Sequence, residues 1–150
     1  MKNLYVAGID SIDIGQDQTS EATKSPSKFC ITIKKRAFGN QEPMYVAYYL
    51  ARPDDVRVAY KTAMQMLMYY NCQANIEATR VSMLTWARDR GFYKYFINRP
   101  RATYPDPNKI PRVRQVGSPA TNTIISHQTD LIADFVEDYS HTIWFTEMLD

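Results

Sequence analysis

The sequence has 150 residues, which is enough for one domain around one hydrophobic core. Hydrophobic residues make up 45% of the chain and charged residues 23%, and this composition excludes an intrinsically disordered protein. The formal net charge is only +2, so a nucleic-acid-binding function does not follow from the total charge and must depend on where the charges lie.

The cysteines and the N-terminus indicate the compartment. Cys30 and Cys72 form neither a CxxC metal pair nor a disulfide framework, so both are expected to be small buried residues in a reducing compartment. The first residues lack the apolar segment of a signal peptide, and no apolar run approaches the roughly 20 residues of a membrane-spanning helix. The sequence therefore predicts a cytosolic protein that contacts no membrane.

Three strands are predicted before any helix. Residues 4–10 are apolar until they end at Asp10, which is typical of a central strand buried on both faces. Residues 11–28 are polar and predict an exposed loop. The short connection between residues 29–33 and residues 44–50 predicts an antiparallel hairpin of two further strands.

Helices and strands then alternate. Pro53 is expected in the first turn of a helix that extends to near Asn71, because apolar residues recur there at helical spacing. A short strand at residues 73–77 follows and ends at a carboxylate, Glu77. A second helix is expected over residues 79–91, from an N-capping threonine to a glycine just beyond its end.

The last third of the chain has a different composition. Residues 92–97 predict a fifth strand, and the five prolines of residues 98–119 exclude a continuous helix or central strand. A long helix is expected from near Thr121, then a short strand at residues 141–145 and the opening of another helix at residues 146–150. The apolar stripe of the long helix consists of Ile124, Leu131, Ile132, Phe135 and Val136.

The order of these elements predicts the fold. Three strands followed by alternating helices and strands predict an α/β fold with a ribonuclease H-like mixed sheet, formed by a three-strand antiparallel meander and then alternating helices and strands over residues 1–150. In this topology the first and fourth strands are parallel neighbours. Asp10 and Glu77 would then lie at the same edge of the sheet, where open α/β sheets place their sites.

Two carboxylates at one sheet edge suggest a metal site. Like charges repel one another until a divalent cation enters, and hard oxygen ligands suit Mg²⁺ or Mn²⁺. Two such ions about 3.5–4 Å apart activate an attacking water and stabilise the leaving oxygen in phosphodiester hydrolysis. Asp13 and Asp17 follow Asp10 closely and are further candidate ligands, with solvated loop acids as the alternative.

Several segments, taken in order, resemble one protein family. Residues 5–13 (YVAGIDSID) resemble the first-strand motif of the nuclease domain of phage large terminase subunits. Residues 47–53 resemble that family's third strand with the entry to its first helix, and residues 70–80 resemble the segment that carries its second catalytic acid. Residues 99–101 and 117–123 are similar to a later loop and helix entry. The resemblance covers nearly the whole chain.

This resemblance implies a metal-dependent endodeoxyribonuclease domain of a DNA-packaging terminase. It implies Asp10 and Glu77 as catalytic metal ligands for Mg²⁺ or Mn²⁺, and Asp13 as a weaker ligand. It also implies double-stranded DNA as the substrate, an ATPase motor domain and other packaging proteins as partners, and the host cytoplasm as the location.

The chain departs from the family pattern in two respects. The phosphate-binding motif G-x-x-x-x-G-K-[ST] of the family's ATPase domain does not occur. The family's third essential acid comes from a helix after the last strand, and the sequence stops about where that helix begins, so we expect a domain truncated at its C-terminus. The third acid is therefore not assigned.

Basic residues concentrate between residues 94 and 114, where Asp106 is the only acid and tyrosines are interleaved. A proline-stiffened basic loop beside a metal site predicts contacts with DNA phosphates, and the alternative is a solvated surface loop. The predicted DNA contacts are Lys94, Arg99, Arg101, Arg112 and Arg114.

Other functions are compatible with parts of the pattern. A junction-resolving nuclease shares the fold, and a non-catalytic nucleic-acid-binding module would share the basic loop. An actin-like ATPase shares the early strands but needs a glycine-rich phosphate turn after the first aspartate, and residues 11–15 (SIDIG) are a poor match for one.

Overall fold

The computed structural model describes residues 3–13, 27–106, 108–109, 111–113 and 115–146. Asp17 as a candidate ligand and Arg114 as a DNA contact lie outside these ranges. So does most of the loop predicted at residues 11–28 and of the helix opening predicted at residues 146–150.

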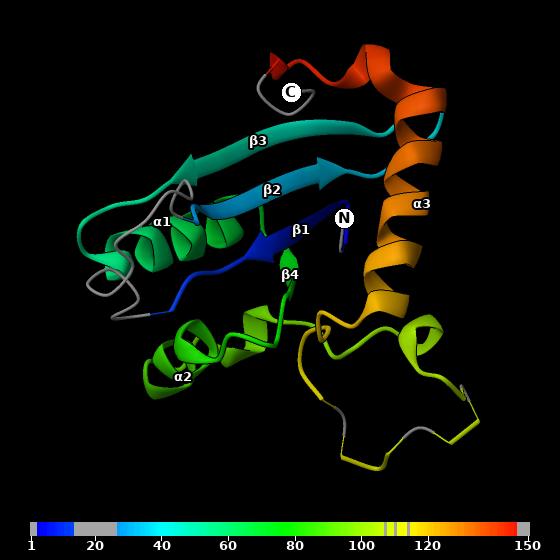
Figure 1. The fold of residues 1–150 in the computed structure, drawn as a ribbon. Coiled ribbons are helices and arrows are strands. Elements are labelled where there is room, and N and C mark those ends of the chain that lie inside the picture. Colours follow the sequence, from blue (N-terminus) through cyan, green and yellow to red (C-terminus); the bar gives the residue numbers. More distant parts are fainter. Residues whose placement is uncertain (1–2, 14–26, 107, 110, 114, 147–150) are drawn as a thin grey trace, which may run out of the picture.

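A four-stranded mixed sheet forms the centre of the molecule, in the order β3-β2-β1-β4. β1 (Tyr5–Asp10), β2 (Phe29–Lys35) and β3 (Met44–Ala51) form an antiparallel meander, and β4 (Gln73–Ile76) lies parallel to β1 (Figure 1). This arrangement confirms the predicted α/β class, the meander and the adjacency of the first and fourth strands.

One face of the sheet is buried beneath the first two helices. α1 (Val56–Tyr69) and α2 (Ser82–Asp89) share one hydrophobic core with the sheet. Asp55 caps α1 by accepting a hydrogen bond of 2.9 Å from the backbone N–H of Arg57, so the helix begins at Val56 rather than at Pro53.

The strands alternate between this core and an open face. Ala7 and Ile9 of β1 are buried, whereas Gly8 and Asp10, which alternate with them, are exposed. The prediction that β1 is buried on both faces is therefore wrong, because its second face carries a glycine and a carboxylate. Cys72 is buried as expected, while Cys30 is half-buried beside Asp10 in the pairing of β2 with β1.

The long helix α3 (Asn122–Tyr139) lies on the open side of the sheet (Figure 1). Thr121 is its N-cap, as expected, and its Oγ1 accepts a hydrogen bond from the backbone N–H of Ile124. Ile124 is buried, but most of the predicted apolar stripe is not, since Leu131 is 54% and Ile132 59% exposed. α3 therefore covers the open face only loosely.

The predicted fifth strand at residues 92–97 is wrong. Residues Tyr93–Tyr95 form a 3₁₀ turn, η1, because the backbone N–H of Tyr95 donates to the carbonyl of Phe92 instead of to a strand. Phe92 packs against Trp86 of α2 with ring centroids 6.0 Å apart, and this contact turns the chain toward the core. Within this segment Phe96 forms an isolated parallel bridge to Ala74 of β4, and the backbone N–H of Ile97 donates to the Ala74 carbonyl at 2.9 Å.

The strand predicted at residues 141–145 is also wrong. Residues Ser140–Thr142 form a 3₁₀ turn, η3, directly after α3, and the Thr142 hydroxyl donates to the carbonyl of Tyr139 at 2.8 Å. The proline-rich segment contains only one further 3₁₀ turn, η2 (Arg101–Thr103), and isolated bridges within the described residues, which agrees with its composition. No helix among the described residues is long and apolar enough to cross a membrane.

Candidate active site

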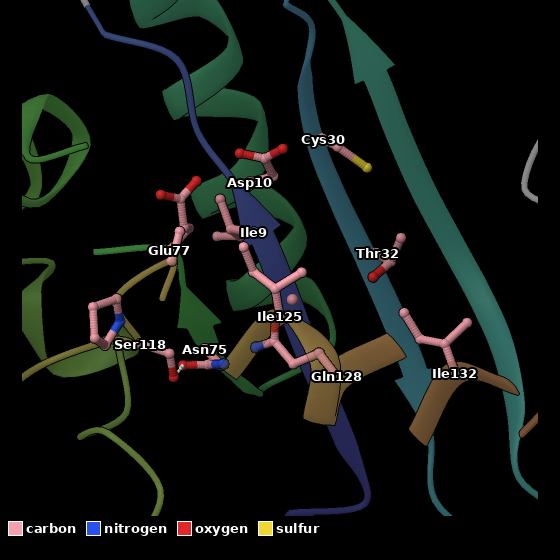
Figure 2. A pocket seen from close by; sticks show the side chains of 13 residues that line it. Ile9, Asp10, Cys30, Thr32, Asn75, Glu77, Ser118, Ile125, Gln128 and Ile132 are labelled. Carbon is pink, nitrogen blue, oxygen red and sulfur yellow. Dashed lines mark hydrogen bonds between the residues drawn. The ribbon is translucent and has the colours of Figure 1, made fainter. Parts of the chain in front are cut away.

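The parallel pairing of β1 and β4 brings the two predicted acids together. Ile9 lies opposite Ile76, so Asp10 and Glu77 are the next residues along the two strands. The backbone N–H of Glu77 donates to the carbonyl of Ile9 at 3.0 Å and extends the pairing to the acid itself. In Figure 2 the two carboxyl groups lie side by side at the carboxyl ends of β1 and β4.

The two acids interact electrostatically. The pKa of the Asp10 carboxyl is raised above its ordinary value, first by desolvation and next by the negative charge of Glu77. A hydrogen bond with Glu77 adds to this rise, and the positive charge of Arg80 opposes it. Ionisation of Asp10 is therefore disfavoured beside Glu77, and a bound cation would stabilise the ionised Asp10 carboxylate.

Glu77 is held from outside the sheet by Gly117 and Ser118, which lie far along the chain from it. The backbone of Ser118 donates to the carbonyl of Ile76 and accepts from the N–H of Ala78, both at 2.9 Å, so it clamps the residues on either side of Glu77. Gly117 makes this close approach feasible, since a Cβ there would lie 2.4 Å from the Ile76 carbonyl oxygen. Its φ of +75° also favours glycine.

A hydrogen-bonded pair of polar side chains, Ser118 and Asn75, adjoins Glu77. The hydroxyl of Ser118, which is 3% exposed, donates to Oδ1 of Asn75 at 3.1 Å. Asn75 lies two residues before Glu77 on β4 and therefore on the same face of the sheet. This hydrogen bond fixes the orientation of the Asn75 amide group.

Asp13 is placed differently from the other two acids. Its Oδ1 accepts a hydrogen bond of 3.2 Å from the backbone N–H of Ser82, the first residue of α2. The cap predicted at Thr79 is wrong, because the Thr79 hydroxyl instead accepts from the N–H of Ala120 at 3.0 Å. Asp13 thus caps α2 across the fold, at a helix end that favours negative charge.

The turn after β1 is fixed by a buried tyrosine. The hydroxyl of Tyr60 donates to the carbonyl of Ile12 at 2.6 Å, in the core. Burial and, after it, the charge of Asp13 raise the pKa of Tyr60 to about 12, so this hydroxyl keeps its proton and remains a donor. The chain that leaves Asp10 is therefore anchored at Ile12 and again at Asp13.

The donor set fits a hard divalent cation. Asp10 and Glu77 offer carboxylate oxygens at one sheet edge. The pKa of Asp10 is raised first by desolvation and next by the charge of Glu77, and a bound cation would offset both effects. Within the described ranges no group of three or more His, Cys, Asp or Glu side chains gathers. The pair thus suits one Mg²⁺ or Mn²⁺ ion, which water and substrate oxygens would complete.

The predicted DNA contacts are in different environments. The guanidinium of Arg99 donates from Nε to the Thr103 hydroxyl at 3.0 Å and stacks on the Tyr104 ring at 4.3 Å, so it supports the loop itself. Lys94 is exposed, with its ammonium 5.5 Å from the ring of Tyr95. Arg101 and Arg112 are exposed side chains.

Sequence reasoning missed several residues around the acids. Asn75 had a local signal, since it shares a strand face with Glu77 two residues away. Ser118 and Arg80 had none, because only the fold brings them to the acid pair.

Comparisons with protein-family models, with curated proteins and with solved structures found no match. The function of the site must therefore be inferred from its own residues.

The two backbone hydrogen bonds of Ser118, which form the clamp around Glu77, predict that replacing Gly117 with alanine lowers the unfolding free energy more than usual. Gly91 and Gly117 have nearly equal φ values of +74° and +75°, but a Cβ at Gly91 would meet nothing within 4 Å. Gly91→Ala should therefore cost only backbone strain, about 1 kcal/mol of unfolding free energy. Gly117→Ala should cost about 3 kcal/mol or more, because the Ile76 carbonyl must move. Urea denaturation measures both, and equal costs would contradict the clamp.

The raised pKa of Asp10, caused first by desolvation and next by the charge of Glu77, predicts a pH-dependent stability. Because the pKa of Asp10 is raised above 3.8 in the folded chain, the folded state binds more protons than the unfolded state, and stability falls as pH rises through this range. Asp10→Asn should therefore raise the melting temperature at about pH 7, and this gain should vanish below about pH 3.5. Asp54→Asn, at an exposed site, is the control. A gain independent of pH would contradict the raised pKa of Asp10.

Proposed function

We propose that this chain carries the ribonuclease H-like nuclease domain of a phage DNA-packaging terminase, a metal-dependent endodeoxyribonuclease. The observation that carries the proposal is the acid pair Asp10 and Glu77 at the carboxyl ends of two parallel neighbouring strands. The strand order β3-β2-β1-β4 supports the ribonuclease H-like part of the proposal. The segments that resemble terminase nucleases support the role in packaging.

In this proposal Asp10 and Glu77 hold Mg²⁺ or Mn²⁺ at the scissile phosphate. The bound cation would activate a water molecule and neutralise charge on the phosphate. Arg80 adds a positive charge close enough to Asp10 to lower its pKa, and so favours the ionised form that binds metal. The Ser118 clamp keeps the Glu77 backbone in place while charge at the site changes.

The substrate and partners follow from the same proposal. Double-stranded DNA would be tracked by the exposed basic side chains of the proline-rich loop, whose base is tied to β4 through the bridge between Glu77 and Ser118. An ATPase motor domain and other packaging proteins would act with the nuclease in the host cytoplasm. A four-way junction is the substrate that would favour the junction-resolving alternative of the same fold.

A second candidate is a non-catalytic nucleic-acid-binding module. The observation in its favour is that only two acids gather at the sheet edge within the described residues, so the charge available for metal is limited. Such a module would keep the basic loop and bind DNA without cleaving it. Cleavage assays with Mn²⁺ on plain duplex and on four-way junctions separate the three candidates.

The metal site predicts stabilisation by Mn²⁺. A hundredfold excess of Mn²⁺ over its Kd should add about 2.7 kcal/mol to the unfolding free energy by mass action. Asp10→Asn and Glu77→Gln should each abolish most of this gain and the cleavage of DNA, whereas Asp54→Asn, an exposed acid elsewhere, should change neither. Thermal denaturation with and without Mn²⁺ measures the gain. A wild-type melting curve indifferent to millimolar Mn²⁺ would refute the metal site.

The basic loop predicts the salt dependence of DNA binding. Replacing Arg101 and Arg112 with alanine should flatten the slope of log K against log salt by about 2, at about 0.9 per phosphate contact on duplex DNA. The matched control, Arg36→Ala with Lys61→Ala, removes the same charge from other exposed positions and should leave the slope nearly unchanged. Titration of labelled duplex at several salt concentrations measures both. Equal slopes in the two double variants would show that the loop is a solvated surface loop that does not contact DNA phosphates.

A further inference from the structure

A cavity of about 450 Å³ extends from the acid pair along the open face of the sheet, beneath α3. Asp10, Glu77 and Thr32 line it from the sheet side (Figure 2), and Gly8 lines it as well. Its size is within the range of about 300–1,000 Å³ that is typical of small-ligand sites. The cavity is thus large enough to hold a ligand that also reaches the acids.

The sheet side of the cavity is open because of Gly8. This residue lies two positions before Asp10 on the same strand face and opposite Asn75 on β4. A Cβ at Gly8 would come no closer than 3.6 Å to the Thr32 hydroxyl, so the missing side chain leaves space rather than relieving a clash. Gly8 and Asp10 are about 6–7 Å apart along β1, from the rise of two strand residues, so the open space at Gly8 lies close to the acid pair.

The helix side of the cavity is mostly apolar. Ile125 and Ile132 line it from α3, and they remain 48% and 59% exposed, so part of their apolar surface faces open space. Their positions, with Gln128 between them, lie on one face of the helix. A flat apolar ligand inserted between α3 and the sheet would remove this surface from water.

Two amide groups line the same cavity. Asn75 enters from β4, and because its Oδ1 already accepts from Ser118, its amide nitrogen is the group left to donate toward a ligand. Gln128 enters from α3, and Figure 2 shows its side chain reaching over β1 toward Asn75. Amide side chains of this kind form complementary hydrogen bonds with the edges of nucleobases.

We propose that this cavity binds one unpaired nucleobase of the substrate strand, next to the phosphate that a divalent cation at Asp10 and Glu77 would hold. The inference rests on the proposed nuclease function and adds a requirement to it. A base that is stacked and paired in a duplex cannot enter between α3 and the sheet, so the nucleotide at the cleavage position must be extruded or already unpaired. Enzymes that read such a base use apolar contact with its faces and hydrogen bonds to its edge.

The test compares DNA ligands that differ by one base. The wild-type chain is titrated in Ca²⁺ buffer with a labelled duplex that carries a single-adenine bulge, and with the same duplex whose bulge is an abasic site. The adenine bulge should bind about tenfold more tightly, which equals about 1.4 kcal/mol. Equal affinity for the two duplexes would overturn the proposal.

A matched pair of variants locates the effect in the cavity. Leu131 and Ile132 are neighbours on α3 with similar exposure, 54% and 59%, but only Ile132 lines the cavity. Ile132→Ala and Gln128→Ala should each reduce the tenfold preference to about threefold or less. Leu131→Ala should leave the preference intact, and an equal loss in Leu131→Ala would overturn the assignment of the base to this cavity.

Failure of this inference is distinguishable from failure of the proposed nuclease function. Cleavage of duplexes by wild type with Mn²⁺, combined with no preference for the adenine bulge, leaves the nuclease proposal standing and removes the base site. A base preference that depends on Ile132 and Gln128, combined with no cleavage and no Mn²⁺ stabilisation, supports the base site on a binding module and removes the nuclease.

Discussion

The backbone hydrogen bonds between β1 and β4 place everything else in the site. Ala74 and Ile76 of β4 are fully buried, so a slip of one residue would turn them out of the core and is strongly disfavoured. This fixed register makes Asp10 and Glu77 neighbours although they are far apart in the chain. The core that stabilises the fold on one face of the sheet thereby sets the spacing of the carboxylates at its edge.

The same pairing makes ionisation of Asp10 unfavourable, and no other contact in the part of the chain that the structure describes fully offsets this effect. Desolvation and the charge of Glu77 disfavour ionisation of Asp10, and Arg80 offsets this only in part. Perturbed carboxylates of this kind concentrate at functional sites, although structural networks also produce them. Here the rigid supports, which are the Ser118 clamp and the Asp13 cap, lie beside the pair and hold it in spite of the repulsion.

The open face of the sheet differs from the core in what it leaves unfilled. Gly8 removes a side chain next to Asp10, and α3 stands over the gap with Ile125 and Ile132 partly exposed. Folding stability alone would favour a close-packed contact there, because apolar surface remains in water. The cavity joins apolar walls, two amide groups and two acids, which is the lining that the proposed nucleobase site requires.

The sequence by itself determined the strands that end at the two acids, the glycine after α2 and the cap of α3 at Thr121, because each depends on periodicity or on residues within one turn. It failed at residues 92–97 and 141–145, where contacts with α2 and the end of α3 replaced strand pairing. Only the tertiary structure brought Ser118 to Asn75, 43 residues away, and Asp13 to α2, because side-chain partners at such separations are chosen by the packed core and leave no local pattern.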